Sequence, residues 1–396
     1  MATRPGLARA VAILAAIAGA VGWAVLGGGG DGPAPPASSI ARAVASTTDR
    51  APDAGGPPSR PGRRSRHVVD AHVHLSLGSL PELRALMDRY GFDHVVDLSG
   101  GAGGRVLAAH LAQAAAMPGR ITVFTTLAYG LAQEPGYGPR LAALVEKAHA
   151  AGAKGLKIAK ALGLGMRRFD GSLVAVDDPE LDVVFETAGR LGLPVAIHTA
   201  DPRAFWQPVS PSNERFAELS VHPGWAFHDA PVPRFDELLA AFERRVARHP
   251  RTTFIGVHFG NDAEDPDRVD RMLRDHPNLY VDLAARIPEL GRHPPARMRA
   301  LLVRWHDRIL YGTDLGIGPP GEPLMLGSTG ATPPTDADRD LFFGATARWL
   351  ETADRAFPHP TPIQGSWPID GVDLPPEVLD DVYWKNAQRV IGLALD

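Results

Sequence analysis

The chain has 396 residues, a formal net charge of −4 and no cysteine, and 44% of its residues are hydrophobic. This composition excludes whole-chain disorder, and the small net charge argues against a nucleic-acid binder with a strongly basic face. The lack of cysteine excludes disulfides, thiolate metal sites and cysteine nucleophiles. Any metal ion must therefore be held by His, Asp, Glu or a modified Lys.

The N-terminal 26 residues have the pattern of an export segment. A start with two arginines is followed by the uncharged, apolar residues 10–26. This pattern predicts either a signal peptide, cleaved near Gly27, or a membrane anchor that just spans a bilayer. Both place the protein outside the cytoplasm, as a secreted, periplasmic or outward-facing anchored form. Residues 27–66 contain 7 Pro and 8 Gly without apolar periodicity and predict a disordered linker.

Residues 67–396 alternate between short β-branched runs and helical patterns. The predicted strands are 68–74, 94–98, 121–126, 155–158, 194–198, 253–258, 279–283 and 309–314. The predicted helices between them are 81–90, 105–117, 140–151, 179–191, 235–249, 266–276 and 295–305. This alternation predicts an α/β fold, a (β/α)8 TIM barrel. Two further helices, 336–350 and 376–393, are expected to pack outside the barrel or over one end.

An open doubly wound sheet is the alternative architecture. It predicts a glycine-rich phosphate loop after the first strand, and the residues after His74 do not form one. The glycine run 100–104 follows the second strand but lacks the Gly-Lys-Ser/Thr ending. We therefore interpret it as a loop that leads into a helix at Arg105.

Ligand-type side chains lie at the predicted C-terminal ends of several strands. His72 and His74 are two residues apart and so face the same side of the first strand. The fifth, sixth and eighth strands end in His198, His258 and Asp314. Because parallel barrel strands end at one mouth, these side chains are expected to converge there. Burying them would be costly unless they were paired or bound a metal ion, so the sequence predicts a metal site.

Five segments together resemble the amidohydrolase superfamily, in particular the branch that includes aminocarboxymuconate-semialdehyde decarboxylase. They are Asp70–Leu75, Ile197–Thr199, Val257–His258, Tyr311–Leu315 and Trp384–Leu393. The resemblance implies a metal-dependent barrel with zinc or a similar divalent ion. It also implies that His72, His74, His198 and Asp314 are ligands or near-ligands, with His258 beside them.

Lys157 on the fourth strand bears on the number of metal ions. Binuclear relatives carry a lysine there that CO2 converts into a bridging carbamate, which would give two ions instead of one. A cation that grips a substrate carboxylate and a lysine paired with a loop carboxylate are the other interpretations. TatD-like deoxyribonucleases have a glutamate at this strand, and this chain has none there.

The expected mechanism uses water activated by the metal ion. Asp314 is the predicted general base, which takes the proton of the water and returns it to the leaving group. His258 would polarise the carbonyl group or stabilise the oxyanion, unless it ligates a second ion. Asp282, at the end of the seventh strand, is expected to support a ligand or cap the strand.

The loops at this mouth supply the candidate substrate-binding residues. Lys160 begins the loop after the fourth strand, and the long loop 199–234 contains Arg203, Trp206 and Arg215. Such residues suit a small organic acid or amide with one apolar side. Trp206 could equally fix the loop to the barrel.

The sequence leaves three functions open. The first is an exported metal-dependent hydrolase that cleaves a C–N or C–O bond of a small molecule, with no nucleic-acid partner. The second is a non-oxidative decarboxylase or C–C hydrolase that uses the same metal site. The third is a non-catalytic binding barrel, and the retained ligand residues argue against it. A homo-oligomer is compatible with all three.

Overall fold

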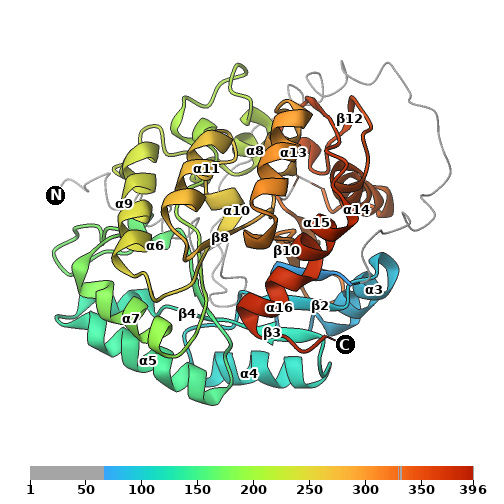
Figure 1. Cartoon of the computed structure of the whole chain (residues 1–396). Coiled ribbons are helices and arrows are strands. Elements are labelled where there is room, and N and C mark those ends of the chain that lie inside the picture. Colours follow the sequence, from blue (N-terminus) through green and yellow to red (C-terminus); the bar gives the residue numbers. More distant parts are fainter. Residues whose placement is uncertain (1–66, 329, 331, 396) are drawn as a thin grey trace.

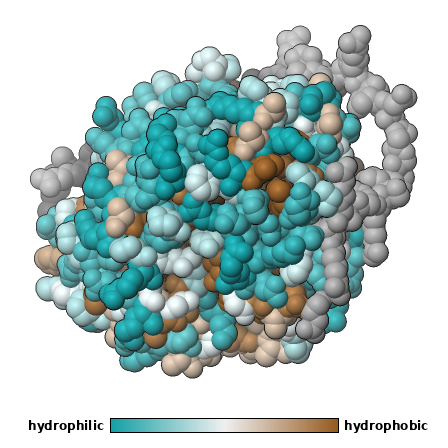
Figure 2. Space-filling view, in the orientation of Figure 1, coloured by the Kyte–Doolittle hydropathy of each residue, from teal (hydrophilic) through white to brown (hydrophobic). Residues whose placement is uncertain are grey.

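The computed structural model describes residues 67–328, 330 and 332–395. The predictions for residues 1–26 and 27–66 lie outside this range. Within it, no helix combines the length and apolar character that a membrane crossing requires. The face of the molecule shown in Figure 2 is mostly hydrophilic, with hydrophobic side chains in small separate groups.

Parallel strands form the centre of the fold, and helices surround them (Figure 1). The strands are β1 (Val69–Leu75), β2 (His94–Asp97), β3 (Ile121–Val123), β4 (Thr125–Thr126), β5 (Leu156–Ile158), β6 (Val195–Ile197), β7 (Phe254–Gly256), β8 (Leu279–Asp282), β9 (Ile309–Leu310) and β10 (Leu315–Ile317). Strands β10-β1-β2-β3 form one parallel sheet and β4 to β9 form another.

Two interrupted strands join these sheets into a barrel of eight strand positions. Phe124 separates β3 from β4, so both belong to the third position, and β9 and β10 share the eighth. The Ala71 N–H donates to the Tyr311 carbonyl at 3.0 Å, and the Asp314 N–H donates to the His72 carbonyl at 2.9 Å. These bonds connect the eighth position to the first. The predicted (β/α)8 barrel is therefore confirmed, with two of its strands broken.

The outer helices match the predicted order. They are α3 (Leu80–Tyr90), α4 (Gly104–Ala115), α5 (Tyr137–Ala151), α7 (Asp182–Arg190), α9 (Phe235–Arg248), α11 (Pro266–Asp275) and α13 (Pro295–Arg304). Their ends follow local sequence signals. The Asp265 side chain accepts the Arg268 N–H at the start of α11, where Pro266 occupies the first turn. Gly91 ends α3 in the left-handed conformation, at φ 68°.

Short elements fill the loops between strands and helices. They are α6 (Ala161–Leu164), α8 (Phe216–Val221), α10 (Val257–Gly260) and α12 (Ile287–Gly291), the strand β11 (Met325–Leu326) that pairs with β10, and the hairpin of β12 (Phe357–Pro358) and β13 (Pro368–Ile369). Most of them follow the C-terminal ends of strands. They therefore build up the mouth of the barrel.

The last helix of the chain closes the opposite end of the barrel. The C-terminal segment comprises α14 (Asp336–Glu351), α15 (Pro376–Asp380), a π-helical turn η7 (Asp381–Lys385) and α16 (Asn386–Ile391). Helix α14 packs outside the barrel against α3, where Phe343 stacks on Tyr90 at 4.0 Å between ring centroids. The Asn386 amide donates to the Ile309 carbonyl at 2.7 Å, at the start of β9. Ala387 and Ile391 pack against the apolar barrel interior, which includes Val69 and Ile255. The expected packing of 376–393 over one end is thus observed.

Phe124 explains two glycines near the third strand. Its side chain is fully buried in the barrel interior. A Cβ atom on Gly155 would lie 2.3 Å from the Phe124 ring, and one on Gly100 would lie 2.4 Å from the Phe124 carbonyl oxygen. Gly100, in the run interpreted as a helix-entry loop, thus permits a close approach of the backbone. The helix α4 begins directly after Gly103, as that interpretation predicts.

Candidate metal centre

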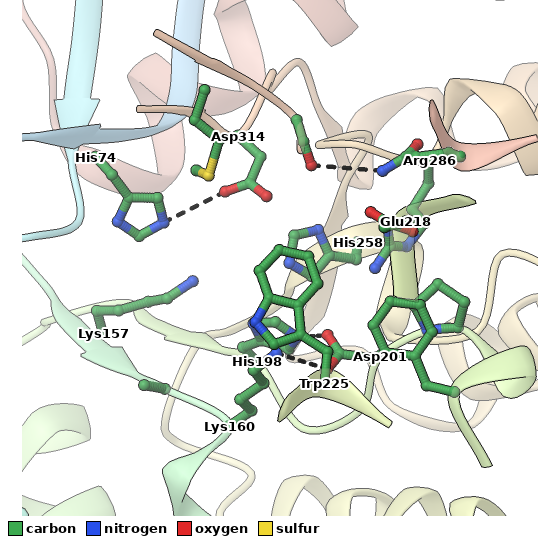
Figure 3. A pocket seen from close by; sticks show the side chains of 16 residues that line it. His74, Lys157, Lys160, His198, Asp201, Glu218, Trp225, His258, Arg286 and Asp314 are labelled. Atoms are coloured by element: carbon green, nitrogen blue, oxygen red, sulfur yellow. Dashed lines mark hydrogen bonds and ion pairs between the residues drawn. The ribbon is translucent and has the colours of Figure 1, made fainter. Parts of the chain in front are cut away.

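His72, His74 and Asp314 converge at the mouth of the barrel. The Nε2 atoms of both histidines lie 3.3 Å from Oδ1 of Asp314. A set of ligand atoms, one from each residue, lies within 4.8 Å of one another, and His72 is fully buried. Figure 3 shows His74 and Asp314 directed toward each other at one side of a cavity. Two imidazoles and a carboxylate at such distances are a donor set suited to a divalent ion.

Both histidines are held through their other ring nitrogen. His72 Nδ1 lies 2.8 Å from Oδ2 of Asp282, and His74 Nδ1 lies 2.9 Å from the Ser99 hydroxyl. Asp282 also accepts the backbone N–H of His258 at 2.7 Å. Contacts of this kind fix the rotamer and tautomer of metal-ligating histidines. They leave both Nε2 atoms facing Asp314, and they give Asp282 the supporting position expected from the sequence.

His258 and His198 lie beside this set. The ring centroid of His258 is 5.1 Å from that of His72 and 4.4 Å from that of His198. His258 Nδ1 lies 2.8 Å from the Ala284 carbonyl, which can only accept a hydrogen bond, so Nε2 carries the lone pair. His198 Nε2 lies 3.2 Å from the Asp201 carboxylate, which leaves the lone pair on Nδ1. Both rings thus offer a nitrogen that can bind a cation.

Burial keeps three of the four histidines neutral. It lowers the pKa of His74, and it lowers that of His198 to about 4 although Asp201 opposes the shift. Burial, with the nearby His198, holds the pKa of His258 well below its ordinary value. Neutral imidazole is the form that coordinates a metal ion. The protonation states therefore fit a metal site as well as the geometry does.

His72 and Asp314 have opposite shifts. Burial and Lys157 work against protonation of His72, but Asp282 and Asp314 together raise its pKa above the ordinary value. Burial acts to raise the pKa of Asp314, yet His72 and His74 hold it well below its usual range. Two imidazole nitrogens and one carboxylate therefore share a position that favours a positive charge. A bound divalent ion would supply that charge.

Lys157 borders the same position. Its Nζ lies 3.4 Å from His72 Nε2, and the side chain is almost fully buried. Burial lowers the pKa of Lys157 to about 8, although Asp282 and Asp314 oppose the shift. The structure thus brings Lys157 to the ligand set, where the sequence placed it.

Strained backbone is concentrated around this site. Seven described residues other than glycine have a positive φ, and five of them follow the ends of barrel strands: His258, Phe259, Asn261, Ala285 and Asp314. A residue with a Cβ atom pays about 1–2 kcal/mol for this conformation. Such outliers are typical of functional sites, where surrounding contacts enforce them.

Asp70 holds the strand that carries Asp314. Its carboxylate accepts the Thr313 N–H at 3.1 Å, the Thr313 hydroxyl at 2.5 Å and the His72 N–H at 3.1 Å. Burial raises the pKa of Asp70 to about 7, although these bonds oppose the shift. Asp70 thereby ties the end of the eighth strand position to β1, and it fixes Asp314 relative to His72.

A cavity opens next to the ligand set, and it encloses about 680 Å³ of space, part of it open to solvent. Its charged and aromatic lining residues include Lys157, Lys160, Arg286, Asp201, Glu218, Asp314, Phe205 and Trp225. His74, His198 and His258 line it as well.

Of the four predicted substrate-binding residues, Lys160 lines the cavity. Its Nζ lies 2.6 Å from Asp201 and 5.2 Å from the centre of the Trp225 ring. Trp206 instead donates to the Pro233 carbonyl at 3.0 Å and packs against Phe227. This contact matches the alternative in which Trp206 fixes its loop to the barrel.

The two arginines of the same loop are engaged with carboxylates. Arg203 pairs with Asp262 at 2.7 Å and lines a separate surface hollow. Arg215 is fully buried between Glu218, at 2.8 Å, and Glu289. Neither arginine is among the residues that line the cavity.

Arg286 is a cavity residue that was not predicted from the sequence. It lies four positions after the end of β8, in the run 283–286. The signal available in the sequence was its place shortly after the C-terminal end of a predicted strand, where barrel sites are built.

Comparisons with known proteins identify similar solved structures and a protein family. No curated protein matches the chain. Solved structures similar to it include 2,6-dihydroxybenzoate decarboxylase from Rhizobium, with 16% identity over 83% of this chain and 99% of that chain and a TM-score of 0.46. A dihydroxybenzoic acid decarboxylase from a Polaromonas species, with bound manganese and the inhibitor 2-nitroresorcinol, has 15% identity over 83% and 98% of the two chains and a TM-score of 0.47.

An amidohydrolase from Burkholderia multivorans with bound zinc is also similar, with 14% identity over 83% of this chain and 100% of that chain and a TM-score of 0.46. The model of the amidohydrolase family matches residues 30–393. This match covers most of the chain, and it agrees with the ligand set at the barrel mouth. The chain therefore belongs to the amidohydrolase family of metal-dependent enzymes.

Proposed function

We propose that this enzyme hydrolyses a C–N or C–O bond of a small organic molecule, with one zinc ion and with Asp314 as the general base. The observation that supports this proposal is the convergence of His72, His74 and Asp314, with ligand atoms within 4.8 Å of one another, beside a cavity at the mouth of the barrel. A divalent ion held there would act as a Lewis acid and lower the pKa of a water molecule toward neutrality.

Zinc suits the nitrogen and oxygen donors of this site. His198 and His258 offer further nitrogen lone pairs beside the set. A carbamate on Lys157 would add oxygen ligands and a second ion. The ratio of metal to protein, measured together with the intact mass, distinguishes one ion from two. Manganese, as in the Polaromonas structure, is the alternative ion for the same measurement.

Asp314 is placed to move protons. It lines the cavity, and its side chain is 15% exposed, so a water molecule can reach it. We infer that the carboxylate takes a proton from the attacking water and returns it to the departing amine or alkoxide. His258 presents a lone pair rather than an N–H at Nε2. It therefore suits a ligand or proton acceptor better than a donor to an oxyanion.

The proposal is tested with metal-loaded protein and a panel of small amides, lactones and aromatic carboxylates. Release of an amine or alcohol supports hydrolysis, whereas release of CO2 favours the decarboxylase alternative. An Asp314→Asn variant should lose about 10²–10⁴-fold in turnover. The control is Asp270→Asn, since Asp270 pairs with Arg304 on the outer helices. Unchanged turnover of Asp314→Asn would refute the role of Asp314 as general base.

Export is a separate proposal, which rests on residues 1–26 alone. If the segment is removed, the mature protein begins near residue 27, whereas an anchored form keeps Met1 or Ala2. Mass spectrometry of the N-terminus of protein from the native membrane and secreted fractions distinguishes these forms. A full-length chain in the cytoplasmic fraction would refute export.

A further inference from the structure

Arg286 carries a charge that no other described residue neutralises by contact. It is 6% exposed and lines the cavity, and its Nη1 donates to the Ala285 carbonyl at 2.9 Å. It forms no ion pair within the described part of the chain. By contrast, the cavity residue Lys160 is paired with Asp201 at 2.6 Å. A guanidinium stays charged at all ordinary pH values, so such burial is costly without an anionic partner.

The acidic side chain beside Arg286 is already engaged. Glu218 lies beside Arg286 in Figure 3. One of its carboxylate oxygens pairs with Arg215 at 2.8 Å, and the other accepts the Ser328 hydroxyl at 2.5 Å. Arg215 also pairs with Glu289. Glu218 is therefore not free to turn toward Arg286.

The backbone turn after β8 holds Arg286 in place. Ala285 has φ 53°, in the left-handed region that residues with a Cβ atom rarely adopt. The same turn presents the Ala284 carbonyl to His258. Figure 3 shows Arg286 next to His258 and across the cavity from His74 and Lys157. One strained turn thus places both an imidazole of the metal site and an unpaired cation at the cavity.

A flat aromatic wall lies at the same cavity. Trp225 stacks on His222 with 3.9 Å between ring centroids and 15° between planes. Phe205, which also lines the cavity, lies 6.2 Å from Trp225 at 23°. These contacts fix the plane of the Trp225 ring. A rigid aromatic face of this kind favours a planar ligand.

We propose that Arg286 binds a carboxylate of the substrate away from the bond that is broken, and that the substrate is a small planar carboxylate whose body lies against Trp225. This inference rests on the proposed function, because it concerns the same cavity. A guanidinium binds a carboxylate through two parallel hydrogen bonds, which gives both affinity and orientation. The carboxylate would provide the contact partner that Arg286 lacks.

Binding of benzoate and of the neutral benzamide tests this proposal by calorimetry. Both probes are planar and of similar size, so they differ mainly in charge. Benzoate should bind more tightly than benzamide, with the metal ion present and after its removal with a chelator. Arg286→Met should weaken benzoate binding about 10- to 100-fold and leave benzamide binding unchanged. Arg286→Lys keeps the positive charge but not the planar pair of N–H donors, and it should give an intermediate loss of benzoate affinity.

Arg304→Met is the matched control, because it removes one positive charge from an exposed pair with Asp270. It should leave binding of both probes unchanged. Equal affinity for benzoate and benzamide, or undiminished benzoate binding by Arg286→Met, would overturn the proposal. So would benzoate binding that disappears on chelation, since the metal ion would then be the anchor. If Arg286→Met does not fold, the comparison of the two probes and the Arg286→Lys variant still decide.

Metal content is measured on the same samples. If the wild-type protein takes up no ion but still prefers benzoate through Arg286, the proposed metal-dependent function fails and the carboxylate site stands. If the ion is bound and the benzoate preference is absent, only the carboxylate site fails. The two outcomes are therefore distinguishable.

Discussion

The two ends of the barrel are built from the same strands but carry different side chains, apolar at one end and polar at the other. At the closed end, Val69 and Ile255 meet Ala387 and Ile391 of α16 in an apolar cluster. At the mouth, imidazoles and carboxylates replace these side chains, and His72 and His74 are each held through a second contact. The closed end depends on apolar burial, and the mouth depends on oriented polar pairs and strained turns.

Residues that stabilise the fold and residues that form the metal site therefore lie at opposite ends of the barrel. Burial of apolar surface is non-directional and tolerates small changes of position. Metal ligation does not tolerate such changes, because each donor atom must lie ~2 Å from the ion and point toward it. We therefore expect substitutions at the closed end to change the free energy of unfolding. Substitutions at the mouth should change metal affinity first.

The largest effect is expected from removal of a metal ligand. His72→Ala deletes an imidazole that contacts both Asp282 and Asp314. Metal affinity and turnover should fall by more than the ~10–100-fold that is typical of supporting residues. Equilibrium dialysis with zinc and a turnover assay measure the two quantities. Retention of a full equivalent of tightly bound zinc would contradict the assigned ligand set.

The closed end should respond in the opposite way. Ile391→Ala removes an apolar side chain from the cluster that α16 forms with the barrel interior. The free energy of unfolding should fall by about 2–5 kcal/mol, and the folded protein should keep its metal content. Urea denaturation measures this change. Val303→Ala, at an exposed position, is the control and should change stability by less than about 0.5 kcal/mol. If Ile391→Ala loses its metal ion but not its stability, the proposed division between a stabilising closed end and a metal-binding mouth is wrong.

Asp282 supports two histidines of the site at once. The Asp282 carboxylate orients His72 through Nδ1 and accepts the His258 N–H. Asp282→Asn keeps the shape of this side chain but removes its negative charge. Zinc affinity should fall about 10–100-fold. Competition with a chromogenic chelator measures it. An affinity equal to that of the wild-type protein would show that Asp282 does not orient the ligand.

Ser99 should have the smallest effect of this series. Ser99→Ala removes one hydrogen bond to His74 Nδ1, at a partly exposed position. We expect a loss of about 0.5–1.5 kcal/mol in the free energy of zinc binding. Ser99→Thr keeps the hydroxyl group and should restore most of it. A loss as large as that of Asp282→Asn would mean that the two supports are equivalent.

The barrel could be predicted from the sequence because its strands and helices follow periodic patterns. The prediction rested on the β-branched runs and on prolines in the first turns of helices, such as Pro81 and Pro266. The breaks at Phe124 and after Leu310 could not be predicted, because they arise from contacts between distant segments. Phe124 packs against Gly155, and the Tyr311 N–H bonds to the Val382 carbonyl of the C-terminal segment.

The ligand set could be predicted because strand parity and strand ends place His72, His74 and Asp314 together. The supporting contacts of His74 with Ser99, and of His198 with Asp201, depend on loop conformations without a periodic signal. The same holds for the substrate side of the cavity. Arg215 and Arg286 are both arginines at the mouth, and only the fold shows that the first is paired with carboxylates and the second is not.

The most direct test of the metal centre is anomalous diffraction from crystals of protein loaded with zinc. We predict a peak within about 2–2.3 Å of His72 Nε2, His74 Nε2 and an Asp314 carboxylate oxygen. A peak elsewhere in the molecule, with the space between these three atoms free of zinc, would contradict the account.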